Sequence, residues 1–236
     1  MAPAASVSTE RLGADIVAVM DAFKVQSPVL VGHAFAGEEM SWIGAHDPNR
    51  VAGLIYLDAA YDRTRIAEEA AIARRIPPTR QMRPEDMESA TSLARWMSAG
   101  LGFPIPESEV RQVARFGPDG RVVGERTPAA VQQRVLAGLV PGDYPSIRVP
   151  ALALYAKRTS TDVAPGCRTP VDETVRRACT ELFDWTSRQL TRSEALVKTI
   201  GARTEIVELP GTSAFVFLSH EAEVTQALDR FVAAIR

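Results

Sequence analysis

The chain of 236 residues lacks the features that mark several large classes of protein. Its 27 basic and 29 acidic residues give a formal net charge of −2, so there is no electrostatic reason to bind nucleic acid or an anionic membrane. No apolar run approaches the roughly 18 residues that a membrane span requires. Three scattered histidines and two cysteines show no metal-ligand spacing, and no nucleotide-binding glycine motif is present. We therefore expect no metal and no cofactor.

The start of the chain and its two cysteines bear on the compartment. Residues 1–5 have neither the basic start nor the apolar core of a secretory signal peptide, so we expect a soluble protein and favour the cytoplasm. Cys167 and Cys179 lie twelve residues apart. A disulfide would fit an exported protein, because such bonds persist in oxidising compartments. For a chain without a recognisable signal, the preferred interpretation is two unpaired thiols.

The pattern of apolar residues predicts an α/β protein with a mostly parallel sheet and flanking helices. Hydrophobic residues make up 46% of the chain, enough for a large core. The predicted strands are 28–33, 51–58, 150–156 and 203–208. The predicted helices of the same unit are 9–23, 36–46, 171–177, 180–199 and 220–235.

Residues 60–145 differ from the rest of the chain because they are highly charged and carry helical patterns in place of buried strands. Gly117–Gly120 reads as a turn. The helices predicted in this segment are 63–75, 84–99, 107–115 and 128–139. We therefore predict a core made of residues 1–59 and 146–236, with residues 60–145 as a helical insertion.

The segment Pro28–Gly37 reads as a buried strand, a turn of small residues and a helix. This is the pattern of a nucleophile elbow, G-x-S-x-G, in which Gly32 and Ala36 flank the centre. The centre is Ala34, whose methyl group cannot act as a nucleophile. The small flanking residues predict a close approach between the strand and the helix.

These residues resemble the α/β-hydrolase superfamily, in particular small serine esterases, lipases and haloperoxidase-like proteins. Further segments resemble the same family in the same order along the chain, and the resemblance covers roughly half of it. These segments are Asp47–Val51, Leu54–Asp58, Val149–Tyr155 and Leu209–Leu218. The insertion stands where the family places a helical cap over its active site, and the resemblance makes it a cap.

The resemblance also assigns the catalytic positions. The nucleophile position is Ala34, the histidine position is Ala214, and the Phe35 backbone N–H is an oxyanion donor. The triad acid is Asp58, which ends a strand, or alternatively Asp162, in the loop after strand 150–156. The segment Leu209–Leu218 resembles the family's histidine loop, and no histidine outside it is assigned as the base. If this segment is misaligned with the family, His220 becomes the candidate base.

The activity implied is hydrolysis of a small apolar ester through a serine ester intermediate, without a cofactor. Alanine at two triad positions disables that chemistry, whether the chain is a natural pseudoenzyme or an engineered knock-out. The alternative is a non-catalytic module that binds a ligand or a protein on a hydrolase scaffold. A third interpretation is an inert gene fragment.

The resemblance places further strands before the elbow, which arrives here at residue 32. We therefore expect the C-terminal portion of the fold, truncated at its N-terminus, with strand 28–33 at an exposed edge. An apolar edge is a template for pairing with another strand. This predicts either a missing N-terminal segment or self-association at that edge.

Overall fold

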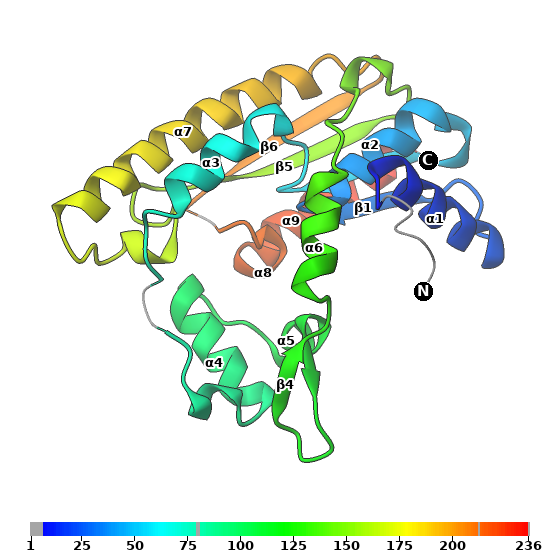
Figure 1. Cartoon of the computed structure of the whole chain (residues 1–236). Coiled ribbons are helices and arrows are strands. Elements are labelled where there is room, and N and C mark those ends of the chain that lie inside the picture. The colour runs from blue at the N-terminus through cyan, green and yellow to red at the C-terminus, as the bar shows by residue number, and fades with distance from the viewer. Residues whose placement is uncertain (1–6, 79–80, 212, 236) are drawn as a thin grey trace.

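The computed structural model describes residues 7–78, 81–211 and 213–235, and it shows a parallel sheet between two layers of helices (Figure 1). Adjacent strands of this sheet pair in parallel, which confirms the predicted fold class. In spatial order the strands are β1 (Val29–His33), β2 (Gly53–Leu57), β5 (Ala151–Lys157) and β6 (Thr204–Pro210). All four lie within the predicted ranges or within two residues of them.

The side chains of each strand alternate between two apolar clusters, one on each face of the sheet. On β2, Leu54 and Tyr56 pack with residues of α1, α2 and α7, whereas Ile55 and Leu57 pack with residues of α8 and α9. The bounds of these helices are α1 (Thr9–Ala22), α2 (Ala36–His46), α7 (Glu173–Val197), α8 (Val216–Ser219) and α9 (Glu221–Ile235). Two-sided burial explains why the strands read as continuous apolar runs.

Among the described strands, β1 pairs only with β2 and forms one edge of the sheet. The side chain of Val31 on this strand is 51% exposed, whereas every residue of β2 is buried. An edge at this place matches the expectation from the sequence. Which partner or segment covers it stays a prediction.

The segment between β2 and β5 contains helices and a hairpin. Its elements are α3 (Ile66–Ala73), α4 (Ala90–Leu101), α5 (Glu107–Val113), β3 (Ala114–Phe116), β4 (Val122–Glu125) and α6 (Ala129–Ala137). In Figure 1, α3 lies along α7 while α4, α5 and β4 lie away from the sheet. Short 3-10 turns occupy Pro48–Arg50, Arg63–Arg65, Pro84–Met87, Tyr144–Ser146 and Pro165–Cys167.

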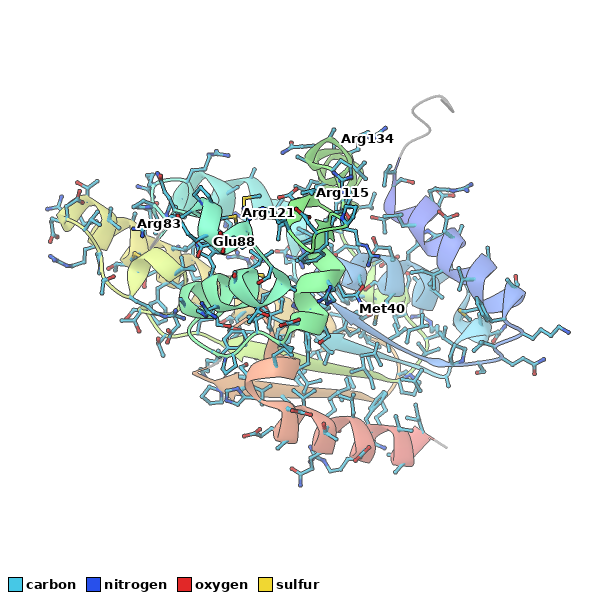
Figure 2. The ribbon with its side chains drawn as sticks, turned by 90° about the horizontal axis from the view of Figure 1, so that it is seen from below. Met40, Arg83, Glu88, Arg115, Arg121 and Arg134 are labelled. Atoms are coloured by element: carbon cyan, nitrogen blue, oxygen red, sulfur yellow. A yellow bond between two sulfur atoms is a disulfide. The ribbon has the colours of Figure 1, made fainter. Side chains whose placement is uncertain are left out.

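The distal part of this segment has a small apolar cluster of its own, formed by α4, α5 and β3, with Leu218 of α8 packed against it. Its surface carries mixed charge. Figure 2 shows Glu88 and Arg121 close together there, with Arg121 Nη1 3.9 Å from Glu88 Oε1. An exposed pair of this kind contributes little stability. The division into a core and a cap stays a prediction.

Several elements differ from the sequence predictions. The helix predicted at 84–99 begins only at Ala90, after the 3-10 turn Pro84–Met87, and the short helix α8 was not predicted. The turn expected at 117–120 joins β3 to β4, a hairpin that the helical pattern over 107–115 concealed. The helices expected at 171–177 and 180–199 are one continuous helix, α7. Asp172 caps it by accepting a hydrogen bond from the Val175 N–H at 2.9 Å. No glycine or proline interrupts the sequence that follows, so nothing ends the helix between the two predicted segments.

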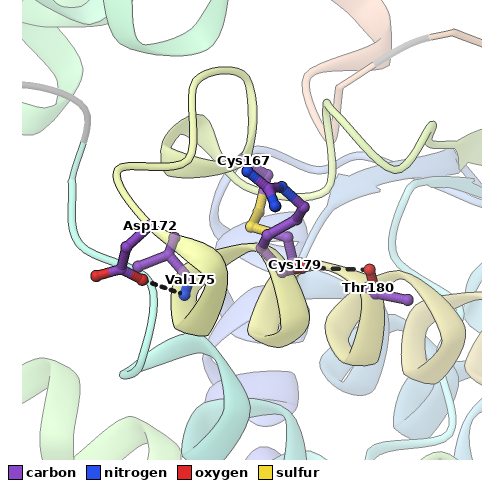
Figure 3. The surroundings of a disulfide bond; sticks show 6 residues. Cys167, Asp172, Val175, Cys179 and Thr180 are labelled. Atoms are coloured by element: carbon purple, nitrogen blue, oxygen red, sulfur yellow. Dashed lines mark hydrogen bonds between the residues drawn. A yellow bond between two sulfur atoms is a disulfide. The ribbon is translucent and has the colours of Figure 1, made fainter.

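Cys167 and Cys179 form a disulfide (Figure 3), so the preference for two unpaired thiols is wrong. The 3-10 turn that ends at Cys167 folds back over α7, and the two Cα atoms lie 5.6 Å apart. This separation falls within the range that a disulfide requires. The fold-back depends on the path of the loop after β5, which the spacing of the cysteines does not reveal.

Reducing the disulfide is expected to destabilise the chain by about 2–3 kcal/mol, because the bond closes a short loop of twelve residues in the unfolded state. Thermal unfolding with and without a reductant measures this as a fall of roughly 5–10 °C. A variant with both cysteines changed to serine should unfold at the lower temperature and ignore the reductant. An unchanged midpoint for the unaltered chain would contradict the bond.

Replacing Gly37 with alanine is expected to cost roughly 1–3 kcal/mol, because the new Cβ would lie 2.3 Å from the carbonyl oxygen of Ala59. That oxygen belongs to the backbone and cannot move aside cheaply. Gly100 of α4 is the matched control, since a Cβ there meets nothing within 4 Å and should be neutral or slightly stabilising. Chemical denaturation of both variants checks the contrast, and equal effects would refute the close-packing argument.

Candidate active site

The turn between β1 and α2 is tight and conformationally unusual. Ala34 has a φ of +54°, a left-handed conformation that costs a residue other than glycine about 1–3 kcal/mol. A Cβ on Gly32 would lie 2.3 Å from Met40 Sδ and 2.9 Å from the Cβ of Ala36. The strand and the helix are thus as close as the sequence predicts. The turn holds the Ala34 side chain at the start of α2.

A cavity of about 360 Å³ opens beside this turn, and it brings most of the predicted site residues together. Ala34, Phe35, Asp58 and Ala214 all line it, although they come from separate parts of the chain. Its size is that of a pocket for a small organic ligand. Asp162, the alternative acid, is not among its lining residues.

Asp58 is a buried group of this cavity with three hydrogen-bond donors around it. It is 3% exposed and, with a φ of +49°, it adopts a left-handed conformation at the end of β2. Its Oδ1 accepts hydrogen bonds from the Ala156 N–H at 2.9 Å and the Tyr61 hydroxyl at 2.5 Å. Its Oδ2 accepts one from Arg158 Nη2 at 3.2 Å. Three donors therefore compensate the burial of this carboxylate.

Tyr61 is a permanent donor in this arrangement. Burial, followed by the charge of Asp58, raises the pKa of Tyr61 well above its usual value. The hydroxyl therefore stays protonated and donates a hydrogen bond to Asp58. Glu69, on the same cavity wall, has its pKa raised by burial.

A buried ion pair lies directly behind the turn, and the sequence analysis did not find it. Arg63 Nε donates to Glu38 Oε1 at 3.0 Å, and Arg63 Nη2 donates to the carbonyl oxygen of Ala34 at 3.3 Å. The same guanidinium lies 4.9 Å from the centre of the Phe35 ring. Glu38 is 1% exposed, and burial raises its pKa to about 7 although Arg63 opposes that shift.

The remaining candidates lie outside the cavity. Asp162 accepts hydrogen bonds from Arg168 Nε at 3.3 Å and from Thr159 Oγ1 at 2.6 Å. His220 lies between α8 and α9, with its Nδ1 3.3 Å from Ser219 Oγ. Neither Asp162 nor His220 lines the cavity.

His33 packs against the loop that carries Ala214 and does not line the cavity. Its Nε2 lies 2.9 Å from the carbonyl oxygen of Ala214, and its ring packs against Phe215 and Phe217. Burial is the main cause that lowers the pKa of His33, so the ring is neutral at pH 7. Because a carbonyl oxygen can only accept, Nε2 carries the proton of the neutral ring and donates a hydrogen bond to Ala214.

Within the described part of the chain, the cavity is lined by acids, arginines, a lysine and aromatic rings, but by no histidine. The aliphatic hydroxyl groups on its wall belong to Thr186, Ser187 and Thr191 of α7, whereas position 34 at the turn carries a methyl group. No group of three or more potential metal ligands occurs among the described residues. The same residues contain no helix with the length and apolar character for a membrane crossing.

No family sequence model and no curated protein sequence matches the chain. Solved structures do match it, at low sequence identity. An E-2-(acetamidomethylene)succinate hydrolase superposes with a TM-score of 0.65 at 14% identity over 99% of this chain and 76% of that one. An esterase from a marine microorganism gives a TM-score of 0.56 at 17% identity over 95% and 77%.

A structure from work on carboxylesterases of Nitrososphaera gargenis gives a TM-score of 0.55 at 13% identity over 100% of this chain and 75% of that one. Together with the sheet topology, these likenesses establish that the chain has the α/β-hydrolase fold. Identities this low identify the fold and assign no substrate.

Proposed function

We propose that the chain is a serine-hydrolase relative whose parent activity is the hydrolysis of small apolar esters, and that it is catalytically disabled as it stands. The observation that supports this is the meeting of Ala34, Phe35, Asp58 and Ala214 around one cavity. In the proposed assignment, Ala34 stands at the nucleophile position, Ala214 at the histidine position, and the Phe35 N–H at the oxyanion site. Asp58 is the acid.

The conformation of Ala34 supports the nucleophile assignment. A left-handed residue at a strand-to-helix turn is expensive for alanine, and the elbow of this fold needs that conformation to present its nucleophile. A serine in the same place would carry its Oγ at the start of α2, where the helix dipole favours developing negative charge. Alanine keeps the geometry and lacks the reacting atom.

The second candidate is a binding module that uses the same cavity without chemistry. The specific observation in its favour is the ion pair between Arg158 and Asp58, since the side chains are 23% and 3% exposed. In a working triad the acid orients an imidazole. Here a guanidinium already satisfies that acid, so the site is electrostatically complete without a histidine.

The two candidates differ in what the unaltered chain does with an ester. The proposal predicts no turnover of short and medium-chain p-nitrophenyl esters above the rate of a protein-free control. A binding module additionally predicts saturable binding of a non-hydrolysable ester analogue, measured by calorimetry. Hydrolysis by the chain as written, abolished by substitutions in the cavity, would overturn the disabled assignment.

The proposal also covers the ligand, the partners and the cellular location of the chain. A small apolar ester-like molecule is the proposed ligand. We also propose self-association or an additional N-terminal segment at the β1 edge, and no binding of nucleic acid. A cytoplasmic location, favoured by the sequence, stays a proposal against which the Cys167–Cys179 disulfide counts, because such bonds persist in oxidising compartments. Sedimentation of the purified chain measures self-association, and a monomer at all concentrations would count against pairing at that edge.

A further inference from the structure

A second cavity, of about 230 Å³, lies between α1, α2 and residues 140–143, and the proposed ester chemistry makes no use of it. It is many times larger than the roughly 30 Å³ that one water molecule occupies in the liquid. Its walls include the apolar groups of Trp42, Ala45, Val140 and Pro141. It therefore has room and contact surface for a short hydrocarbon chain.

Glu38 is one of the residues that line this second cavity, and its Oε1 accepts a hydrogen bond from Arg63 Nε. The Glu38 side chain is fully buried, with 0% exposure. Its Oε2 is also buried, and among the described residues it has no hydrogen-bond partner. An unpartnered buried carboxylate oxygen is costly, and a donor that reaches this wall would remove the cost.

Acids predominate on the wall of this cavity. Glu10 and Asp143 line it together with Glu38, whose charge Arg63 partly balances, and no lysine or arginine is among its described lining residues. The one basic group on the wall is His46, an exposed side chain whose ring stacks on Trp42 and whose Nδ1 lies 2.9 Å from the carbonyl oxygen of Trp42. The cavity therefore attracts a cation.

We propose that this second cavity binds a protonated alkylamine, with the ammonium group donating to Glu38 Oε2 and the alkyl chain lying against Trp42, Val140 and Pro141. An organic cation fits better than a metal ion, because the described residues contain no group of three or more potential metal ligands. An ammonium group supplies the donors that the buried oxygen lacks. Its attraction to the acids strengthens in a partly buried site.

The amine would share one carboxylate with Arg63. Because Arg63 also lines the first cavity and donates to the carbonyl of Ala34, Glu38 joins the two cavities physically. A ligand in the second cavity would thus lie three hydrogen bonds from the proposed nucleophile position, through Glu38 and Arg63 to the Ala34 carbonyl.

A titration of the whole chain with n-butylammonium chloride at pH 8 tests the proposal. The readout is the indole N–H resonance of Trp42 in an NMR spectrum, assigned with a Trp42→Phe variant. We expect a saturable shift of this resonance that neither n-butanol nor sodium chloride reproduces at the same concentration. Absence of a saturable shift, or an equal shift with n-butanol, would overturn the proposal.

Matched variants localise the binding. Glu38→Gln should weaken butylammonium binding at least tenfold, whereas Glu39→Gln, a neighbouring buried glutamate that does not line the cavity, should leave it unchanged. If Glu38→Gln fails to fold, the exposed Asp143→Asn replaces it and should weaken binding several-fold. Unaltered affinity in a folded Glu38→Gln variant, or in Asp143→Asn where that variant stands in, would refute the assignment.

Discussion

A chain that carries Ala34→Ser and Ala214→His together is expected to hydrolyse short activated esters at least ~100-fold faster than the unaltered chain, since triad groups contribute about 10⁶ in turnover in intact serine hydrolases. Both positions line the cavity that contains Asp58, so a hydroxyl and an imidazole would enter the same space. Stopped-flow or plate assays of p-nitrophenyl esters measure the gain. Each single substitution should stay near the background, because neither group works without the other.

The double variant Ala34→Ser, Ala214→His, called the revertant below, also distinguishes the two candidate acids Asp58 and Asp162. In the revertant, Asp58→Asn should return turnover to the background of the unaltered chain, because an equivalent change in an intact triad costs a factor on the order of 10⁴. Asp162→Asn is the matched control and should leave turnover unchanged, because Asp162 lies outside the cavity. Equal losses, or a loss confined to Asp162→Asn, would contradict the assignment of Asp58.

Arg158 is the obstacle to full reversion. It pairs with Asp58 Oδ2 at 3.2 Å, the carboxylate that a new imidazole would need to contact. We therefore expect the added change Arg158→Ala to raise the activity of the revertant further. No effect of this change would indicate that the imidazole reaches Asp58 without displacing the guanidinium.

Glu38 is expected to make the free energy of unfolding fall between about pH 5 and pH 8. Burial raises its pKa from 4.5 to about 7, so in this range the folded chain binds a proton that the unfolded chain has released. The stability associated with that proton is fully present below pH 4.5 and is lost as the pH rises through about 7. The shift corresponds to about 3 kcal/mol.

Denaturation of the unaltered chain and of Glu38→Gln across this pH range isolates the contribution. Glutamine does not titrate, and all other groups are shared, so the stability of the variant relative to the unaltered chain should rise by about 3 kcal/mol from pH 4.5 to pH 8. Most of the change should fall between pH 4.5 and about pH 7, the two pKa values that bound it. A difference that is independent of pH would contradict the raised pKa.

Local patterns were sufficient to predict the sheet and the turn at Ala34. Strands such as β5 (Ala151–Lys157) are buried on both faces, and buried parallel strands leave a continuous apolar signature. The hairpin β3–β4 was missed because its strands are short and the first follows α5 directly. The Cys167–Cys179 bond was missed because it depends on how a loop folds back on α7.

For the candidate site, too, some residues could be predicted from the sequence and others could not. The family pattern predicted Ala34, Phe35, Asp58 and Ala214, and the structure places all four on one cavity. The pattern carries no information about Arg63, which is distant in sequence from its partner Glu38. The one available signal was a pair of glutamates in the first turn of a helix with an apolar environment, an unusual place for charge.

The most direct test of the account is covalent labelling of the folded chain at position 34. A fluorophosphonate reacts with an activated serine, and intact-mass spectrometry followed by peptide mapping locates the adduct. The account predicts stoichiometric labelling of the Ala34→Ser, Ala214→His variant at position 34. It predicts no labelling of a control with Ala36→Ser and Ala214→His. A folded double variant that stays unlabelled, or a control that labels equally well, would contradict the claim that Ala34 occupies the nucleophile position.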